Sequence, residues 1–467
     1  MTELSADRIA RRVRDAPDSI AVIDRRESVS YSHFWSRVER SAAGMRGMRR
    51  IAVLPTSDVG SLVSVAAAML SGVSVVLLHR HLLPEQYARV IEIAEPDAVV
   101  ASASRHRRLR RLGCADPRGR LDADGGHTTA TGDSELLVGV TSGTSGEPKL
   151  FVRDQDSWAC TFDRSDERFD VRPGDRVSTP GVLDHTHFLY GAVHGLTRGA
   201  AIDLRPAIDA LGSGATHLYS VPTIAWDIAR SGSGTFPGVR EVLSSAARWP
   251  ASGREQLQQV LPNASLVHFY GASELSFVSW DSGVEPTAGT LFDGVDAEIR
   301  DGVVYVRSNM LFDGYLTADG VTGGPADGWM TVGDRGLLEG RRLTLFGREV
   351  ETLIRSGLNV ELAPIEAAAL AISGVLDAAC VAIADARAGE VPALAVVLGA
   401  DAPSLNEIRR ALRRSLPTPS MPTSISALAH LPRTPRGKLD RQALGATFAT
   451  ERTAPSTTNH SVRAPSS

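Results

Sequence analysis

A loop rich in glycine and hydroxyl side chains offers the clearest chemistry in this sequence. The segment VTSGTSGEPK occupies residues 140–149 and follows an apolar run, residues 136–141, that predicts a strand. Its two glycines allow the backbone to turn tightly and approach a ligand. Successive backbone N–H groups can form a nest for an anion, and the hydroxyls and one ammonium supply further donors. The loop therefore predicts a phosphate site formed by Thr141, Ser142, Gly143, Thr144, Ser145, Gly146 and Lys149.

The spacing in this loop differs from that of the GxxxxGK[ST] phosphate loop. Lys149 stands three residues after the second glycine instead of next to it, and Pro148 precedes it. Taken alone, the segment is also compatible with an ordinary surface turn. The choice between these interpretations depends on the rest of the chain.

Further segments make the sequence resemble the adenylate-forming superfamily, which includes acyl-CoA synthetases, peptide-synthetase adenylation domains and luciferases. TSGTSGEPK resembles the phosphate loop of that family. Four later segments match its other motifs in the same order: YGASE (270–274), GWMTVGD (328–334), GREVETLIRSGLNV (347–360) and PRTPRGKLDR (432–441). The resemblance spans roughly residues 30 to 445, and the sequence looks most like short bacterial acyl-CoA ligase-like proteins.

The resemblance implies that the protein uses ATP to activate a carboxylate as an acyl-adenylate, with release of pyrophosphate. Thr144 and Glu274 would hold Mg²⁺, which prefers hard oxygen ligands. Lys438 would contact the carboxylate and phosphoryl oxygens as charge moves between them. The catalytic candidates are Lys438, Glu274, Arg348 and His185. The remaining nucleotide contacts are expected from Ser245, Ala246, Tyr270, Gly271, Ser273, Asp334 and Arg348.

The pocket for the acyl group is harder to predict. Its candidate residues are Asp184, His185, His187, Ala246 and His268. Asp184 is notable because amino-acid-activating members of the family carry an Asp near this place, where it pairs with the substrate amine. A buried carboxylate needs a partner or must become neutral. One hypothesis is therefore an amino-substituted acid, and the alternative is that Asp184 only supports its loop.

Composition narrows the classes of partner. The formal net charge of −4 disfavours nucleic acid and anionic membranes as partners. An arginine-rich stretch at residues 103–120 is compatible with an anion-binding patch or with a solvated helix and loop. The three cysteines form no CxxC pair, no segment has the length and apolarity of a membrane span, and no signal peptide is evident, so we expect a cytoplasmic protein.

The pattern of elements predicts an α/β fold with at least two domains. Strand-like and helix-like segments alternate over residues 50–100, which favours parallel β-sheets covered by helices. Short strands with Asp-Gly turns over residues 298–346 predict a β-rich subdomain. We expect a large N-terminal AMP-binding domain over residues 1–347, a small mobile α+β lid over 348–450, and a disordered tail over 451–467. The active site is expected between the two domains.

Two departures from the family pattern concern the second half of the reaction. The hinge position, usually Asp or Lys, is Val350, and the loop IRSGLNV (354–360) lacks the usual Gly-Gly pair. The expected acceptor is coenzyme A. The alternatives are a carrier-protein thiol, an amine, or nitrite in a diazotase-like reaction with an amino-substituted acid. A catalytically silent nucleotide-binding relative is a rival of a different class, which the retained Lys438, Glu274, Asp334 and Arg348 disfavour.

Overall fold

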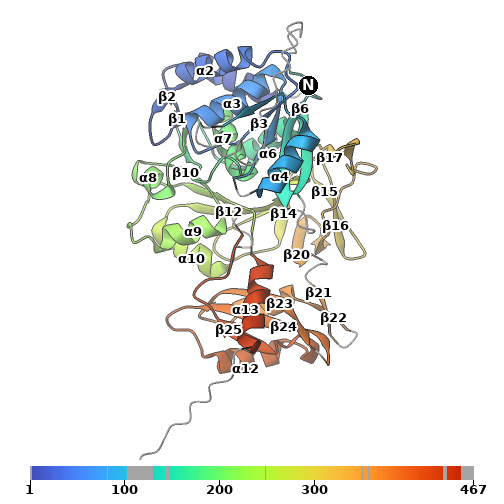
Figure 1. The fold of residues 1–467 in the computed structure, drawn as a ribbon. Helices are drawn as coiled ribbons and strands as arrows, with labels where there is room; N and C mark the ends of the chain where they lie inside the picture. The colour runs from blue at the N-terminus through green and yellow to red at the C-terminus, as the bar shows by residue number, and fades with distance from the viewer. Residues whose placement is uncertain are drawn as a thin grey trace, which may run out of the picture. The chain divides into compact units, whose positions relative to one another are not determined.

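The chain forms two compact units, residues 1–345 and residues 346–467 (Figure 1). The computed structural model describes residues 3–80, 82–101, 130–142, 148–247, 249–348, 352–355, 358–385, 387–434 and 439–453. The predicted loop positions Gly143, Thr144, Ser145 and Gly146, together with Val350 and Lys438, lie outside these residues. So does the whole arginine-rich stretch, residues 103–120. The predicted α/β class, with a large N-terminal part and a smaller C-terminal part, is confirmed.

The larger sheet joins thirteen of the described strands. In spatial order they are β15 (Asp296–Arg300), β16 (Val303–Arg307), β19 (Asp334–Glu339), β20 (Arg342–Arg348), β14 (Gly289–Leu291), β13 (Ser276–Ser282), β12 (Ser265–Ala272), β11 (Glu241–Ser244), β10 (His217–Ser220), β8 (Arg176–Ser178), β9 (Ala201–Asp203), β1 (Ile20–Ile23) and β2 (Ser28–Ser30). The run from β12 to β1 through β11, β10, β8 and β9 is parallel. The short strands predicted after residue 298 are present, and several of them extend this sheet.

The second sheet joins seven described strands. They are β18 (Gly320–Thr322), β17 (Gly314–Thr317), β7 (Pro148–Asp154), β6 (Glu135–Ser142), β4 (Ser74–Leu77), β3 (Arg50–Val53) and β5 (Ala98–Val100). Strands β6, β4, β3 and β5 are parallel, whereas β6, β7 and β17 pair antiparallel. The two strands that flank the predicted phosphate loop, β6 and β7, are thus neighbours in one sheet.

The core explains why these strands are apolar along their whole length. Ile51 and Val53 of β3 face one hydrophobic cluster, and Ala52 between them faces another. Successive side chains of a strand point to opposite faces, so a strand covered on both sides needs apolar residues at every position. Helix α4 packs Tyr87 and Val90 on the second face.

The described helices of the large unit are α1 (Ser5–Asp15), α2 (Tyr31–Ala43), α3 (Val59–Ser71), α4 (Pro84–Ala94), α6 (Gln155–Arg168), α7 (Thr186–Arg198), α8 (Ala207–Gly212), α9 (Pro222–Arg230) and α10 (Ala251–Val260).

The small unit has its own sheet and its own apolar clusters. Its described elements are β21 (Thr352–Arg355), β22 (Leu358–Glu361), α11 (Ala363–Leu370), β23 (Val375–Asp385), β24 (Gly389–Leu398), α12 (Leu405–Ser415), the 3₁₀ turn Thr418–Ser420, β25 (Ser424–Ala427) and α13 (Arg441–Thr453). Helix α12 begins where the sequence signals a start, because Ser404 and Glu407 form a reciprocal capping box.

Helix α13 extends by three residues into the segment that the sequence predicts to be a disordered tail. It is described as far as Thr453. Leu444 and Phe448 anchor this helix in a buried cluster with β23 and β24. The polar residues that follow extend a helix that is already nucleated, which costs far less than starting one. Pro455 disfavours helical conformation at the residue before it.

No helix among the described residues combines the length and apolar character needed to cross a lipid bilayer.

A substitution at Gly139 should measure how tightly the core between the strands is packed. A Cβ added at Gly139 would lie 2.1 Å from a ring carbon of Phe151, which is buried. We expect Gly139→Ala to lower the free energy of unfolding of the large unit by about 1–3 kcal/mol through overpacking. Urea denaturation followed by tryptophan fluorescence reports on this unit, because all six tryptophans lie in it.

The matched control is Gly212→Ala at the end of α8. An added Cβ there meets no atom within 4 Å. This variant should be neutral or slightly stabilising, because Ala reduces the conformational freedom of the unfolded chain. Equal unfolding midpoints for the Gly139→Ala and Gly212→Ala variants would contradict the packing argument.

Candidate active site

The carboxyl ends of neighbouring parallel strands bring the predicted nucleotide residues to one edge of the large sheet. Strand β11 pairs in parallel with β12, and Ser244 lies opposite His268. Ser245 and Ala246 follow the end of β11, and Ser273 follows the end of β12. Ligands of open α/β sheets bind in the crevice beyond the carboxyl ends of the strands. The predicted residues therefore lie where this architecture places ligands.

The Ser245–Ala246 loop has an unusual backbone. Ala246 has a φ of 75°, in the left-handed region that residues with a Cβ rarely adopt. The Ser245 hydroxyl donates to the carbonyl of Phe269 at 2.9 Å, so the loop is tied to β12. Such conformations persist only where the surroundings hold them, and they cluster at ligand sites.

Two predicted nucleotide contacts, Tyr270 and Asp334, touch each other. The Tyr270 hydroxyl donates to Oδ2 of Asp334. Tyr270 lies in β12 and Asp334 begins β19, 64 residues later in the chain. The contact brings together two residues that are predicted to contact the adenine and the ribose.

Glu274 lies in the tight turn between β12 and β13. The turn is so tight that a Cβ on Gly271 would lie 2.0 Å from the carbonyl oxygen of Ser276. The Glu274 carbonyl accepts from the N–H of Phe312 at 3.0 Å, and Oε1 accepts from the Tyr315 hydroxyl at 2.8 Å. Among the described residues Glu274 forms no ion pair.

This environment of Glu274 fits a magnesium ion that is shared with a nucleotide. A carboxylate without a cationic partner offers the hard oxygen donor that Mg²⁺ prefers, and Mg²⁺ in nucleotide enzymes takes further oxygens from phosphates and water. The described residues contain no group of three or more His, Cys, Asp or Glu that could hold a metal ion by themselves. Glu274 would therefore contribute one ligand, as the sequence predicts together with Thr144.

Arg153 holds this turn in place from the second sheet. Its guanidinium donates to the carbonyls of Ser273 at 3.3 Å and Ser157 at 3.2 Å, to the carbonyl of Met310, and to the Ser276 hydroxyl. Burial lowers the pKa of Arg153 to about 10, so the side chain remains charged at neutral pH. Charged donors to several carbonyls fix the backbone of the turn strongly.

Lys149 is positioned by the hairpin that brackets the predicted phosphate loop. Thr141 of β6 lies opposite Lys149 of β7, and the Thr141 hydroxyl donates to the Lys149 carbonyl at 3.4 Å. The Lys149 side chain is exposed, with Nζ 5.2 Å from the centre of the Tyr315 ring. Ser142 ends β6 next to this point. The hairpin thus presents the ammonium at the base of the loop.

Asp184 is buried and has a cationic partner in the large unit. Its side chain is only 1% exposed and is paired with Arg80: the Arg80 Nη1 donates to Oδ1 at 3.2 Å, and the Arg80 backbone N–H donates to Oδ2 at 3.0 Å. The buried carboxylate therefore has its cationic partner within the protein, 104 residues away in the chain. This geometry does not support the predicted pairing of Asp184 with a substrate amine.

Three predicted histidines lie near the ends of β10–β12. His185 caps the start of α7 and accepts from the His187 N–H through Nδ1 at 3.3 Å. His187 Nε2 donates to the Ser220 carbonyl at 2.8 Å, and its ring lies 5.5 Å from that of Phe269. Burial lowers the pKa of His187 to about 4 and that of His268 to about 3. Both rings are therefore neutral at physiological pH.

In the small unit, the segment that carries Lys438 is clamped on both sides. Arg433 pairs with Asp377 at 2.7 Å, and Arg441 pairs with Glu366 at 2.8 Å. Arg433 bridges Leu439 in an isolated antiparallel pair, so the two ends of the loop lie together. Lys438 itself lies outside the described residues. Arg348 is the last residue of β20.

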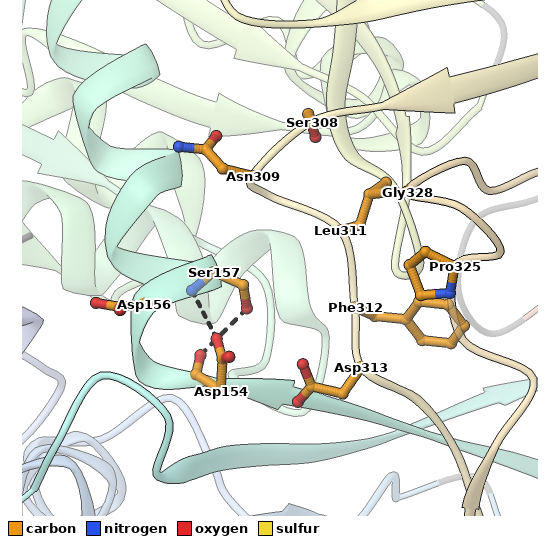
Figure 2. A pocket seen from close by; sticks show the side chains of 10 residues that line it. All are labelled: Asp154, Asp156, Ser157, Ser308, Asn309, Leu311, Phe312, Asp313, Pro325 and Gly328. Carbon is orange, nitrogen blue, oxygen red and sulfur yellow. Dashed lines mark hydrogen bonds between the residues drawn. The ribbon is translucent and has the colours of Figure 1, made fainter.

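Figure 2 shows the side chains that line a hollow of about 340 Å³ in the large unit. It is lined by Asp154, Asp156, Ser157, Ser308, Asn309, Leu311, Phe312, Asp313, Pro325 and Gly328. Burial and the nearby Asp154 carboxylate raise the pKa of Asp313 to about 6. None of the residues predicted from the sequence to bind nucleotide or acid lines this hollow.

Solved structures of adenylate-forming enzymes share this fold. ATP-bound MatB from Rhodopseudomonas palustris has a TM-score of 0.82 at 23% identity, covering 96% of this chain and 99% of its own. The amide bond synthetase McbA from Marinactinospora thermotolerans has a TM-score of 0.81 at 23% identity, covering 95% and 99%. The chain therefore has the fold of the adenylate-forming enzymes.

Sequence comparison gives the family. The model for AMP-binding enzymes matches residues 9–316, and the model for the AMP-binding enzyme C-terminal domain matches residues 364–438. A Bacillus subtilis protein described as an uncharacterized acyl-CoA ligase, YhfT, is 32% identical over 465 residues, covering 91% of this chain and 94% of its own. The Staphylococcus epidermidis putative long chain fatty acid-CoA ligase VraA is 29% identical over 329 residues, covering 66% and 70%. The chain therefore belongs to the AMP-binding enzyme family, and the predicted resemblance to the adenylate-forming superfamily is confirmed.

The neutral, buried state of His187 predicts a pH dependence of stability. Its folded-state pKa of about 4 lies below the ordinary value of 6.5, so the unfolded chain binds the proton first as the pH falls. The stabilising contribution is complete above pH 6.5 and is lost as the pH falls toward 4. His187→Gln cannot be protonated, and its amide can still donate to the Ser220 carbonyl.

Between about pH 7.5 and 5, the wild type should therefore lose on the order of 1 kcal/mol more unfolding free energy than His187→Gln. Urea denaturation at both pH values measures this difference. His33→Gln, at an exposed position, is the matched control and should retain the pH dependence of the wild type. Identical pH dependence in the wild type and His187→Gln would contradict the assignment.

Proposed function

We propose that this enzyme activates a small carboxylic acid with ATP and then transfers the acyl group to coenzyme A. In the first step a carboxylate oxygen attacks the α-phosphorus of ATP, pyrophosphate leaves, and an acyl-adenylate forms. In the second step the thiol sulfur attacks the acyl carbon, a thioester forms, and AMP leaves. This assignment makes the chain an AMP-forming acid–thiol ligase.

The observation that carries this proposal is the environment of Glu274. The Glu274 carboxylate forms no ion pair among the described residues and accepts a hydrogen bond from the Tyr315 hydroxyl. Glu274 follows the end of β12, the strand that contains Tyr270. Mg²⁺ held there would neutralise charge on the phosphates. The protein itself aligns the groups: the Tyr270–Asp334 contact orients the residues expected at the adenosine, and β7 presents Lys149 toward phosphate. Preorganised charges of this kind stabilise the transition state.

The use of lysine supports the roles of Lys149 and Lys438. Of the 50 lysine and arginine residues in the chain, only these two are lysines. An ammonium is a compact charge that can follow a moving oxygen, whereas a guanidinium is a planar fork that binds a fixed pair of acceptors. Lysine thus occurs only in the two motifs that are expected to handle phosphate.

The acid itself is proposed to lack an amino group. His187 and His268 are neutral, and the carboxylate of Asp184 is already neutralised by Arg80. A pocket with these walls would desolvate a substrate ammonium without offering it a free anion, which is unfavourable. A small, uncharged acyl chain or aromatic acyl group suits these walls better.

Coenzyme A is the proposed acceptor because the relatives that match most of the chain are described as acyl-CoA ligases. A carrier-protein thiol, an amine or nitrite are the competing acceptors. The buried free thiols of Cys160 and Cys380 are compatible with the cytoplasmic location that we propose.

The proposal is tested by pyrophosphate exchange into ATP across aliphatic, aromatic and amino-substituted acids. Products are then identified by mass spectrometry with coenzyme A, with simple amines and with nitrite. We expect acid-dependent exchange and a thioester with coenzyme A. An amide or a diazo product in place of the thioester would change the acceptor. No acid-dependent exchange would refute adenylation.

Replacing Lys438 should show its part in adenylation. We expect Lys438→Ala to reduce the rate of pyrophosphate exchange by about 10²–10³-fold, as is typical when one preorganised charge contact is lost. Lys438→Arg should recover only part of this loss because the guanidinium has a different shape. Arg413→Ala removes an exposed cation from α12 of the same unit and should retain the wild-type rate. Equal rates in the wild type and Lys438→Ala would rule out this role.

A further inference from the structure

Tyr315 links two residues of opposite charge that come from different parts of the chain. Its hydroxyl donates to Glu274 Oε1 at 2.8 Å, and the ammonium of Lys149 lies 5.2 Å from the centre of its ring. A cation over the face of an aromatic ring is attracted by the ring's negative π face. One side chain therefore contacts both the anion and the cation of the proposed phosphate site.

The fold explains why these three residues meet. Strand β17 pairs antiparallel with β7, and Tyr315 lies opposite Phe151. Lys149 is two residues before Phe151, on the same face of the sheet and diagonal to Tyr315, within reach of long side chains. The Glu274 turn is fastened to the segment just before β17, because Phe312 N–H donates to the Glu274 carbonyl. The Phe312 ring also packs edge-on against Tyr315 at 5.0 Å.

The contacts of Tyr315 keep the two charges apart. Lys149 and Glu274 form no ion pair in the part of the chain that the structure describes. A free ammonium and a free carboxylate at this range would otherwise attract each other and neutralise the site. The ring instead holds the ammonium, and the hydroxyl occupies one carboxylate oxygen, which leaves Oε2 for another ligand.

We propose that Tyr315 is a positioning residue that separates Lys149 from Glu274, so that Lys149 binds phosphate while Glu274 binds the accompanying magnesium ion. This inference rests on the proposed function for the tasks of the two charged groups. Tyr315 itself need not touch the nucleotide. The alternative is that the residue merely fills space in the half-buried surface of β17.

Two variants separate the hydroxyl from the ring. Tyr315→Phe retains the ring beneath Lys149 but removes the donor to Glu274. We expect its affinity for ATP without magnesium to stay within about twofold of the wild type. The magnesium concentration at half-maximal effect should rise about five- to tenfold, the usual consequence of losing one hydrogen bond to a charged group. Tyr315→Leu should in addition weaken metal-free ATP binding by about two- to fivefold, because the cation–π contact is lost.

The measurement is isothermal titration calorimetry of ATP with and without Mg²⁺, followed by the magnesium dependence of pyrophosphate exchange. Tyr305→Phe is the matched control. Tyr305 lies in β16, and the guanidinium carbon of Arg300 lies 4.3 Å from the centre of its ring, but Tyr305 takes no part in the proposed site. This control should retain both the affinity and the magnesium response of the wild type.

The outcomes distinguish this inference from the proposed function. A wild-type magnesium response in Tyr315→Phe, with or without a lower melting temperature, would overturn the positioning role and leave a packing role. If the wild type binds ATP with magnesium but exchanges pyrophosphate with no acid, the proposed function fails, and the calorimetric comparison still decides the role of Tyr315. If the wild type binds no ATP, both are overturned.

Discussion

The geometry of the candidate site depends on one buried cation, the guanidinium of Arg153. It projects from β7 of the seven-stranded sheet and donates to the turn that leaves β12 of the thirteen-stranded sheet. Its partners are carbonyls and a hydroxyl, and it forms no ion pair among the described residues. Because a buried charge is costly unless its donors are satisfied, the carbonyls around it are constrained to stay where they are. These contacts fix the two sheets relative to each other near Glu274 and Lys149.

The contacts of Arg153 explain how a strained backbone conformation at Ser276 persists. Ser276 has a φ of 59°, and its hydroxyl is one of the acceptors of Arg153. The left-handed conformation reverses the chain between β12 and β13 so tightly that only glycine fits at position 271. A more relaxed turn would displace Glu274 from Tyr315 and from the segment before β17. The charge of Arg153 and the strain at Ser276 therefore belong to a single arrangement.

Local patterns predicted the elements well, whereas the long-range partners could not be predicted. The strand predicted over residues 136–141 lies within β6, Glu135–Ser142, because its continuous apolar run marks a strand that is covered on both faces. The motif residues Tyr270, Glu274 and Asp334 could be singled out because each stands in a recognisable segment.

The partners were missed because they carry no local signal. Arg80 lies in no motif, and the pairing that neutralises Asp184 spans 104 residues. Tyr315 resembles any aromatic residue of a short strand until the register of β17 with β7 is known. Helix α13 was not predicted, because the composition of its segment does not reveal that Leu444 and Phe448 are buried in a cluster with β23 and β24.

The near absence of lysine affects how the protein can be handled. Succinimidyl esters and aldehyde fixatives attack primary amines, which most proteins offer at many dispensable surface positions. Here the only side-chain amines belong to Lys149 and Lys438, and Lys149 is exposed. Coupling through these amines to a resin or a sensor chip would attach the protein by the two side chains that we propose bind phosphate. Amine-directed labelling that is harmless to most proteins would, in this chain, modify the proposed active site.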